Sequence, residues 1–285
     1  MTALCAFSEV SLPMPMLRLS MMGRKLALLV AAASVLLSLP LVTCADGTAP
    51  RSILSRTARG HAMRYYLAPP AEGAPQASRP ILVVCCPRGA QPDMVRAYAN
   101  ADRESRFIIV APVIVTNSGK QDPSGVGYGQ DVVDLVAHEG GGRFDEEGIL
   151  AIVGELQTEF SAQHRFFITG FSAGGHATWL MVFLHPDLLA GAVSNSGNFI
   201  GRSLPGRALS QSPERATLPI REIIGSDDGH YPSLYAQWQA ARKLATDNGW
   251  GNLSEEIVPG EKHAPRPDRV LAFFSPILAN PQPAH

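Results

Sequence analysis

The sequence contains few cysteines, and their positions do not suggest a disulfide framework. The chain has 285 residues and four cysteines, which are Cys5, Cys44, Cys85 and Cys86. The first two lie in or before the apolar N-terminal segment considered below, and the adjacent Cys85 and Cys86 cannot easily bridge each other within one strand. An exported domain of this size can depend on its core instead, so we expect no disulfides.

Charge is also scarce and almost balanced. Charged residues make up 17% of the chain, and the formal net charge is -1. Electrostatic binding to nucleic acid needs a basic surface, so we expect no nucleic-acid partner. The hydrophobic fraction of 46% is instead that of a globular protein with a sizeable core.

The N-terminal part has the three regions of a secretory signal peptide. Basic residues precede a nearly unbroken apolar run, Leu26–Leu37, and small residues follow at Thr43–Ala45. The basic residues are Arg18, Arg24 and Lys25. Pro40 and the short apolar length argue against an uncleaved membrane anchor. We therefore expect residues 1–45 to direct export.

The end of this segment offers a second interpretation. Leu41–Cys44 resembles a bacterial lipoprotein box, although threonine before the cysteine is atypical. A lipid on Cys44 would anchor the mature chain, and this is the only membrane contact that we expect. In either case residues 46–285 remain, enough for one large α/β domain.

Predicted strands alternate with predicted helices through this domain. Apolar and β-branched segments predict strands at 61–67, 81–86, 107–110, 166–168, 190–194, 220–224 and 253–258, the first at a sheet edge. Helices are predicted at 94–104, at 144–160, after residue 174 and from residue 269. The alternation predicts a doubly wound, mostly parallel sheet with helices on both faces. The polar, glycine-rich segment 116–129 is predicted to be a surface loop.

One stretch has the pattern of a nucleophile elbow. The segment Gly170–Gly174 reads G-F-S-A-G, follows the apolar strand 166–168 and precedes a helix, which is the context that a G-x-S-x-G motif requires. Glycines on both sides of the serine allow a sharp turn that exposes the hydroxyl of Ser172. The N–H of Ala173 begins the helix, where backbone donors have no partner, so it is a candidate oxyanion-hole donor.

Two further strand ends carry side chains that could activate a serine. Gly225–Asp228 follows the strand 220–224, and His263 follows the strand 253–258. In open α/β sheets the ligand lies at the carboxyl ends of the strands, so we expect these residues to meet Ser172. Histidine can accept the serine proton, and a carboxylate can orient the histidine. From the residues alone, Asp227 and Asp228 compete for the role of the acid.

From about Tyr65 to Phe274 the chain resembles the α/β-hydrolase superfamily. The order Ser, Asp, His along the chain is that of these enzymes. The matching segments are Phe167–Gly175, His185–Asp187, Ser194–Gly197 and Gly225–Asp228. Within the superfamily the chain is most similar to secreted esterases of the feruloyl esterase and polyhydroxybutyrate depolymerase type. The resemblance implies a triad of Ser172, His263 and Asp228, since the third position after Gly225 favours Asp228.

One segment departs from the resemblance. Such enzymes usually carry His-Gly after the strand that supplies the second oxyanion donor, whereas this chain has Cys86-Pro87-Arg88-Gly89. Proline has no N–H to donate. The resemblance therefore assigns the second donor by position to the N–H of Arg88, with Gly89 as a second candidate. A distorted loop at Pro87 would lower the activity or abolish it.

The resemblance thus implies an exported serine carboxylic-ester hydrolase that needs no metal or organic cofactor. Residues 198–217 are too few for a large cap domain, so we expect an open site that suits a bulky or polymeric ester. Two alternatives remain. One is a prolyl-oligopeptidase-like peptidase, although this chain has no room for the propeller domain that such enzymes often carry. The other is a catalytically silent binding module that keeps the fold. The residues do not indicate an oligomeric state.

Overall fold

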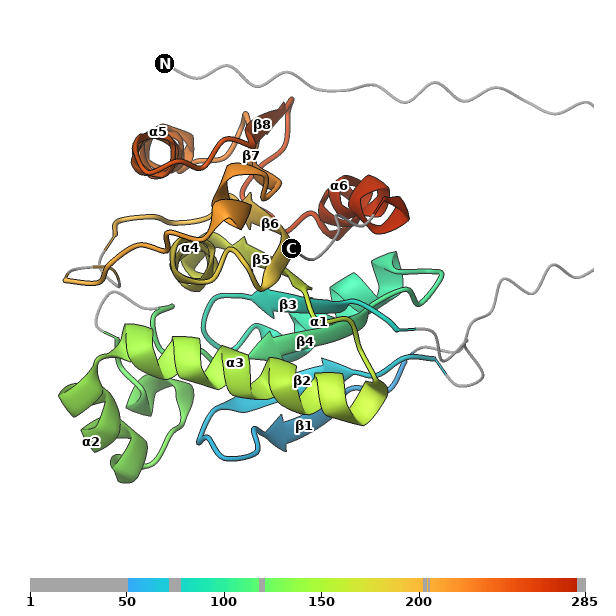
Figure 1. Ribbon diagram of the computed structural model, residues 1–285, viewed down its shortest axis with the longest axis vertical. Coiled ribbons are helices and arrows are strands. Elements are labelled where there is room, and N and C mark those ends of the chain that lie inside the picture. Colours follow the sequence, from blue (N-terminus) through green and yellow to red (C-terminus); the bar gives the residue numbers. More distant parts are fainter. Residues whose placement is uncertain (1–50, 72–77, 118–120, 202–203, 205, 281–285) are drawn as a thin grey trace, which may run out of the picture. The chain divides into compact units, whose positions relative to one another are not determined.

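An eight-stranded sheet forms the centre of the structure, a computed structural model that describes residues 51–71, 78–117, 121–201, 204 and 206–280 (Figure 1). The strand order is β1-β2-β4-β3-β5-β6-β7-β8. β1 and β2 are antiparallel to their neighbours, and the pairings from β4 across to β8 are all parallel. The predicted signal peptide, residues 1–45, lies outside the described residues.

The strands are short, and all but the two outermost, β1 and β8, are largely buried. They are β1 (Leu54–Thr57), β2 (Arg64–Ala68), β3 (Ile81–Cys85), β4 (Ile108–Pro112), β5 (Phe166–Phe171), β6 (Leu189–Asn195), β7 (Ile220–Gly225) and β8 (Leu253–Val258). β3 and β4 are buried at every position. Both are continuous apolar runs because both faces of a parallel sheet are covered by helices. The parallel strands also run in one direction, so their carboxyl ends share one edge of the sheet.

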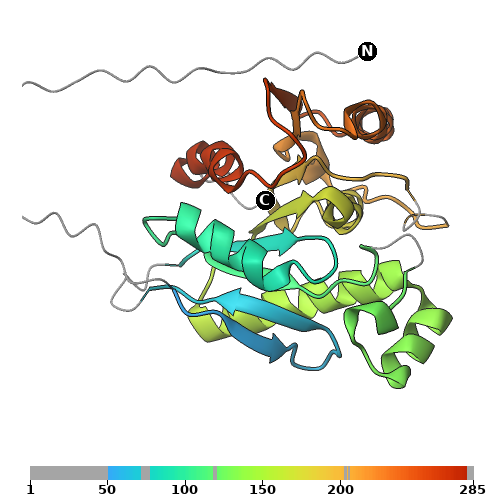
Figure 2. The ribbon, with the colours of Figure 1, turned by 180° about the vertical axis from the view of Figure 1, so that it is seen from behind.

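Helices cover both faces of the sheet. α1 (Gln91–Ala101) and α6 (Pro267–Ala279) pack on one face. The other face is covered by α2 (Gln130–Glu139), α3 (Gly141–Phe160), α4 (Gly175–Leu184) and α5 (Tyr231–Asp247). In Figure 1, α3 lies in front of the strands and α1 behind them, and Figure 2 shows the reverse. Short 3-10 helices lie at η1 (Ser124–Val126), η2 (Ser172–Gly174) and η3 (Pro213–Ala216).

Aromatic side chains fix the position of α4, the helix that follows Ser172. Trp179 packs against Trp238 of α5 with ring centroids 6.0 Å apart, and Phe183 meets Trp250 edge-on at 5.3 Å. All four rings are almost fully buried. Burial of each such ring stabilises the fold by about 1.5–3 kcal/mol. The helix behind the predicted nucleophile is therefore anchored in the core.

The predicted doubly wound sheet is confirmed, with boundary shifts of a few residues. The prediction that segment 61–67 lies at the sheet edge is wrong, because β1 pairs outside β2 and takes that place. The helices α2 and α5 were not predicted from the sequence. The 3-10 helix η1 lies within the predicted loop 116–129. Between β6 and β7 the described residues form no helix or strand other than η3, so this connection holds no cap domain.

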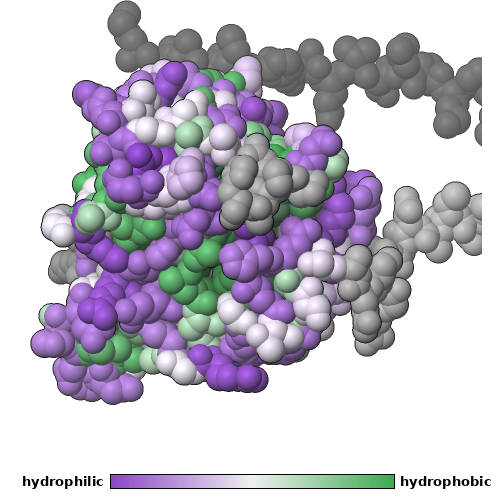
Figure 3. Space-filling model, in the orientation of Figure 1, coloured by the Kyte–Doolittle hydropathy of each residue, from purple (hydrophilic) through white to green (hydrophobic). Residues whose placement is uncertain are grey.

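The face of the molecule seen in Figure 3 is mainly polar. Figure 3 shows a mostly hydrophilic face on which apolar residues gather in smaller patches between the polar ones. Among the described residues the exposed large apolar side chains are Leu54, Leu135 and Ile200. No described helix combines the length and the apolar character needed to span a membrane.

Candidate active site

Ser172 lies on a strained turn at the carboxyl end of β5. The strand ends at Phe171, and the 3-10 turn Ser172–Gly174 leads directly into α4. Ser172 has a φ of 51°, in the left-handed region that residues other than glycine rarely adopt. This conformation tips the side chain out of the strand direction, as the elbow motif requires.

Two glycines make this turn possible. A Cβ on Gly170 would overlap the Thr178 hydroxyl and the backbone of Gly174, and a Cβ on Gly174 would overlap the carbonyl of Cys85. The second contact matters for the site because Cys85 ends β3. Close packing at Gly174 therefore brings the end of β3, and the loop that begins at Cys86, directly against the elbow.

The structure brings Ser172, His263 and Asp228 together from three separate strand ends. Nε2 of His263 lies 3.0 Å from Oγ of Ser172, and Nδ1 lies 2.6 Å from Oδ2 of Asp228. Because a carboxylate only accepts, the neutral ring donates Nδ1–H to Asp228, and Nε2 is left to accept the Ser172 hydroxyl proton. Ser172 follows β5, Asp228 follows β7 and His263 follows β8.

Of the two competing acids, only Asp228 contacts the histidine. Its side chain is fully buried, and its second oxygen accepts the N–H of His230 at 2.8 Å. Asp227 is exposed, and its carboxylate accepts the hydroxyl of Ser226. Burial alone would raise the pKa of Asp228, but the His230 N–H and the His263 ring together hold it below its ordinary value. Asp228 is therefore ionised near neutral pH and can accept the Nδ1–H of His263.

Two rings flank the His263 imidazole. The ring of Phe171 lies 4.8 Å away at a tilt of 35°, and that of His230 lies 5.3 Å away and nearly perpendicular. About a quarter of the His263 side chain is exposed. The ring is thus supported by neighbours yet open to a molecule arriving from solvent.

The loop after β3 is the place where the sequence predicted a second oxyanion donor. The Ala90 N–H donates to the Pro87 carbonyl at 3.2 Å, and Gly89 has a φ of 76°, so Arg88 and Gly89 occupy the two central positions of a tight turn. The Arg88 side chain points away to the surface, where it lies 3.9 Å from the Asp122 carboxylate. Any contribution of Arg88 to an oxyanion hole would therefore come from its backbone.

The two cysteines beside this loop do not have the character of nucleophiles. Cys85 and Cys86 are both buried and unpaired. Burial raises the pKa of Cys86 to about 12 and that of Cys85 well above the ordinary range. Both are neutral thiols near neutral pH, and only a thiolate is strongly nucleophilic.

Other polar residues of the site were not predicted from the sequence. The Asn117 amide donates to the Cys86 carbonyl at 3.3 Å, which ties the loop after β3 to the loop after β4. Glu222 of β7 is almost fully buried and accepts the Gly197 N–H at 3.4 Å. Burial raises its pKa well above the ordinary value, although Ser194, Gly197 and the charge of Arg266 partly offset this. The sequence showed no sign of either residue, because each contacts a partner that is distant along the chain.

Among the described residues no group of three or more His, Cys, Asp or Glu could hold a metal ion.

Comparison with known proteins bears on the fold. No family model and no curated protein matches the chain. Solved structures match at low identity. Poly(aspartic acid) hydrolase-1 from Sphingomonas sp. KT-1 has a TM-score of 0.54 at 14% identity over 80% of this chain and 98% of its own. Esterase PE8 has a TM-score of 0.53 at 18% identity over 79% of this chain and 100% of its own. An esterase from Thermogutta terrifontis has a TM-score of 0.51 at 16% identity over 81% of this chain and 92% of its own.

These matches define the class of the fold. The chain has the α/β-hydrolase fold, and its structural neighbours are esterases and other hydrolases. At these identities the likeness concerns the architecture, and a fold of this kind hosts many activities. The chemistry of this chain has to be argued from its own residues.

Proposed function

We propose that this chain is an exported serine hydrolase that cleaves carboxylic esters through Ser172, His263 and Asp228. The observation that carries the proposal is the continuous pair of contacts from Ser172 Oγ to His263 Nε2 at 3.0 Å and from His263 Nδ1 to Asp228 at 2.6 Å. A serine hydroxyl is a weak nucleophile and needs an adjacent, oriented base. Both requirements are met within ordinary hydrogen-bond distances.

In the first half of the reaction Ser172 Oγ attacks the ester carbonyl carbon while His263 Nε2 takes its proton. The negative charge on the carbonyl oxygen would be stabilised by the N–H of Ala173 and by an N–H of the loop after β3, with Arg88 as the proposed donor. Collapse of this intermediate breaks the bond to the alkoxy oxygen. The proton on His263 then passes to the leaving alcohol, and an acyl-enzyme on Ser172 remains.

In the second half a water molecule replaces the alcohol. His263 takes a proton from the water, whose oxygen attacks the acyl carbon, and the same donors stabilise the second intermediate. Collapse releases the acid, and the proton on His263 returns to Ser172 Oγ. Asp228 keeps the imidazole in one tautomer throughout and stabilises the imidazolium when it forms. No metal or organic cofactor enters this scheme.

The proposed substrate class is a bulky or polymeric ester, as in the feruloyl esterase and polyhydroxybutyrate depolymerase type. Three features support this choice: the partly exposed His263, the β6–β7 connection, whose described residues form no cap domain, and the sequence resemblance. Export through residues 1–45, with or without a lipid on Cys44, is part of the same proposal. An exported enzyme can reach a polymer that does not enter the cell.

The proposal is tested by measuring hydrolysis of short-chain aryl esters, feruloyl esters and hydroxybutyrate oligomers by the wild type and by Ser172→Ala. We expect turnover of at least one ester class by the wild type and its loss in the variant. A parallel panel of peptide and polyaspartate amides tests the peptidase alternative. Amide cleavage that exceeds ester cleavage would move the proposal to that class.

A silent binding module is the remaining alternative, and Pro87 is the feature that favours it. Such a module would fold cooperatively and show no turnover that depends on Ser172. Cooperative unfolding by urea, measured on the same preparations, separates a folded inactive protein from a damaged one.

A further inference from the structure

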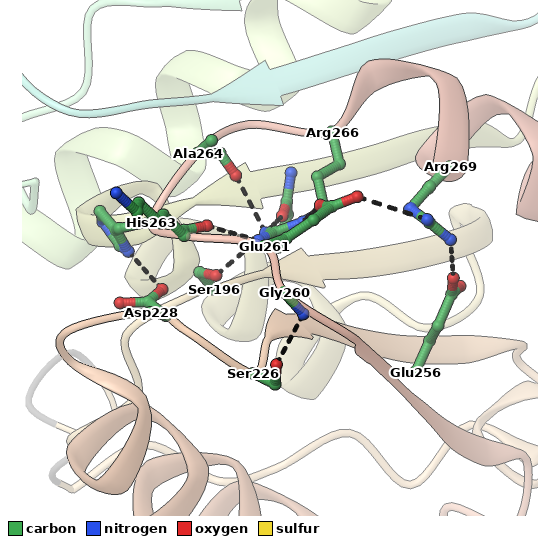
Figure 4. A network of polar contacts seen from close by, with 12 residues as sticks. Ser196, Ser226, Asp228, Glu256, Gly260, Glu261, His263, Ala264, Arg266 and Arg269 are labelled. Carbon is green, nitrogen blue, oxygen red and sulfur yellow. Dashed lines mark hydrogen bonds and ion pairs between the residues drawn. The ribbon is translucent and has the colours of Figure 1, made fainter.

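Arg266 is a buried cation whose guanidinium touches the backbone on both sides of His263. The residue lies just before α6 and is only 5% exposed. Its Nη2 donates to the carbonyl of Lys262 at 2.6 Å, and its Nη1 donates to the carbonyl of Ala264 at 2.9 Å. Figure 4 shows the guanidinium inside the bend of this loop, with His263 facing Asp228 on the other side. One side chain thus binds the carbonyl groups of the two residues next to His263 in the chain, Lys262 and Ala264.

The same guanidinium ties this loop to β6. Nη1 also lies 3.1 Å from Oδ1 of Asn195 and 3.2 Å from Oγ of Ser196. Asn195 pairs directly with Phe171, the residue before Ser172. The position of His263 is therefore set relative to the strand that borders the nucleophile. Ser196 also faces Asp228 and contributes to its lowered pKa.

The loop fits closely against the turn that carries Asp228. The Asp227 N–H donates to the Glu261 carbonyl at 3.0 Å, and the Gly260 N–H donates to Ser226 Oγ at 2.8 Å. A Cβ on Gly225 would overlap both the Glu261 carbonyl and the Arg266 guanidinium. Glycine at the end of β7 is thus required for this approach.

The charge of a buried cation has to be balanced by nearby acceptors. The acceptors around Arg266 are arranged to suit the guanidinium group. Glu261 accepts from Nε at 2.5 Å and balances the charge. The remaining contacts are four neutral oxygen acceptors, three around Nη1 and one at Nη2, and a planar guanidinium suits this arrangement better than a single ammonium group does. A simple ion pair would not need the two carbonyls beside His263.

We propose that Arg266 is a positioning residue that holds His263 between Ser172 and Asp228. This rests on the proposed function, since the position matters for turnover only if His263 is the base. Displacement of a catalytic group by about 1 Å can cost on the order of 100-fold in rate. Loss of the guanidinium should therefore lower kcat strongly and leave the KM nearly unchanged, because Arg266 does not contact the substrate.

The test compares Arg266→Lys with Arg269→Gln. Arg269 shares Glu261 and pairs with Glu256 but touches no carbonyl beside His263, so it is the matched control (Figure 4). We expect Arg266→Lys to lose roughly 100-fold in kcat, with the KM changed by less than about threefold. Arg269→Gln should keep both constants. An Arg266→Lys variant that folds and keeps the wild-type kcat would overturn the proposal.

A proton NMR signal separates this proposal from the proposed function. The His263 Nδ1–H that is bonded to Asp228 should give a low-field resonance in the wild type and in Ser172→Ala. That resonance should disappear or broaden in Arg266→Lys and persist in Arg269→Gln. If the wild type shows no ester turnover, the proposed function fails, while this resonance still decides the role of Arg266.

A second variant keeps the test decisive if Arg266→Lys does not fold. Asn195→Ala keeps the guanidinium and removes one acceptor that ties it to β6. Because a hydrogen bond to a charged group is lost, we expect a decrease in kcat of about tenfold or more with little change in KM. An unchanged kcat together with an unchanged resonance would contradict the positioning role.

Discussion

The two oxygens of the Asp228 carboxylate bind different partners. Oδ2 accepts Nδ1–H of His263 at 2.6 Å, and Oδ1 accepts the His230 N–H at 2.8 Å. The backbone contact fixes the plane of the carboxylate, so the oxygen that faces the imidazole cannot easily rotate away. The ring is thereby held with Nε2 directed at Ser172.

Replacing Asp228 by asparagine should abolish most turnover. The variant keeps the size of the side chain but allows an amide to donate to Nδ1, which favours the wrong tautomer of His263. In the well-studied serine protease triad this change costs on the order of 10⁴ in kcat, and we expect a loss of similar order here. Steady-state kinetics on a short-chain aryl ester measure it.

Asp227→Asn is the control for this prediction. The side chain is exposed and its carboxylate contacts Ser226 rather than His263. Turnover within a few-fold of the wild type is expected. If Asp227→Asn were the more damaging change, the role of the acid would pass to Asp227.

Ser172 and His263 should behave as one unit. We expect Ser172→Ala and His263→Ala each to remove nearly all ester hydrolysis, and the double variant to be little worse than either, since the effects of groups that act together do not add. Additive losses would mean that the two residues act independently.

The local motifs allowed the sequence to predict that the candidate residues Ser172, His263 and Asp228 lie together. Ser172 was identified because the elbow needs glycines at fixed offsets from the serine. Gly170 and Gly174 meet these offsets, and they lie close together in the chain, so a local pattern is enough to find them. His263 and Asp228 follow the strands that the sequence predicted at 253–258 and 220–224. β1 was missed because Leu54–Thr57 is short and mostly exposed, which leaves no apolar alternation to detect.

The second oxyanion donor can be tested without changing the turn. Gly89 has a φ of 76° and occupies the third position of the turn Pro87–Ala90, which is a geometry that accepts proline at position 88. Arg88→Pro removes the N–H, and we expect it to lose about 10²–10³-fold in kcat. Arg88→Ala keeps the N–H and should retain kcat within a few-fold.

Unfolding midpoints of both Arg88 variants provide the control for this experiment. An Arg88→Pro variant that is folded and fully active would exclude this N–H and leave Gly89 as the second candidate. A large loss in Arg88→Ala would instead assign a role to the side chain.

Glu222 should make the stability of the protein depend on pH. Its pKa is raised in the folded state, mainly by burial. Above the ordinary pKa of a glutamate the unfolded chain has released this proton while the folded protein still holds it, so stability falls as the pH rises. Glutamine does not titrate. Between about pH 5 and about pH 7, the stability of Glu222→Gln relative to the wild type should therefore rise by up to about 1.4 kcal/mol per pH unit.

Urea unfolding at several pH values measures this difference. Glu104→Gln, which changes an exposed glutamate, serves as the control and should show no comparable slope. If the free energies of unfolding of Glu222→Gln and the wild type change equally with pH across this range, the pKa of Glu222 is not raised in the folded protein.

Arg266 and Glu222 also mark the limit of what the sequence could predict. The partners of Arg266 at the end of β6, Asn195 and Ser196, lie 71 and 70 residues earlier in the chain, so no local pattern indicates them. A buried charge contradicts the local rule that arginines are exposed. Only the assembled sheet shows that its guanidinium is surrounded by acceptors.

If the protein is exported, its mature form should begin at a defined residue. If residues 1–45 act as a signal peptide, secreted material should begin near Cys44 or Asp46, with a lipid on Cys44 in the lipoprotein case. N-terminal sequencing and intact mass measure this. A mature chain that retains Leu26–Leu37 would contradict cleavage.

The most direct test of the central claim is covalent labelling with a fluorophosphonate probe, followed by mass spectrometry of the labelled peptide. Such probes react with a serine only when a base activates it and an oxyanion hole stabilises the adduct. We predict one label on Ser172 in the wild type, and none in Ser172→Ala or in His263→Ala. A folded wild type that takes up no label, or a label on another serine, would contradict the proposal that Ser172, His263 and Asp228 form a working active site.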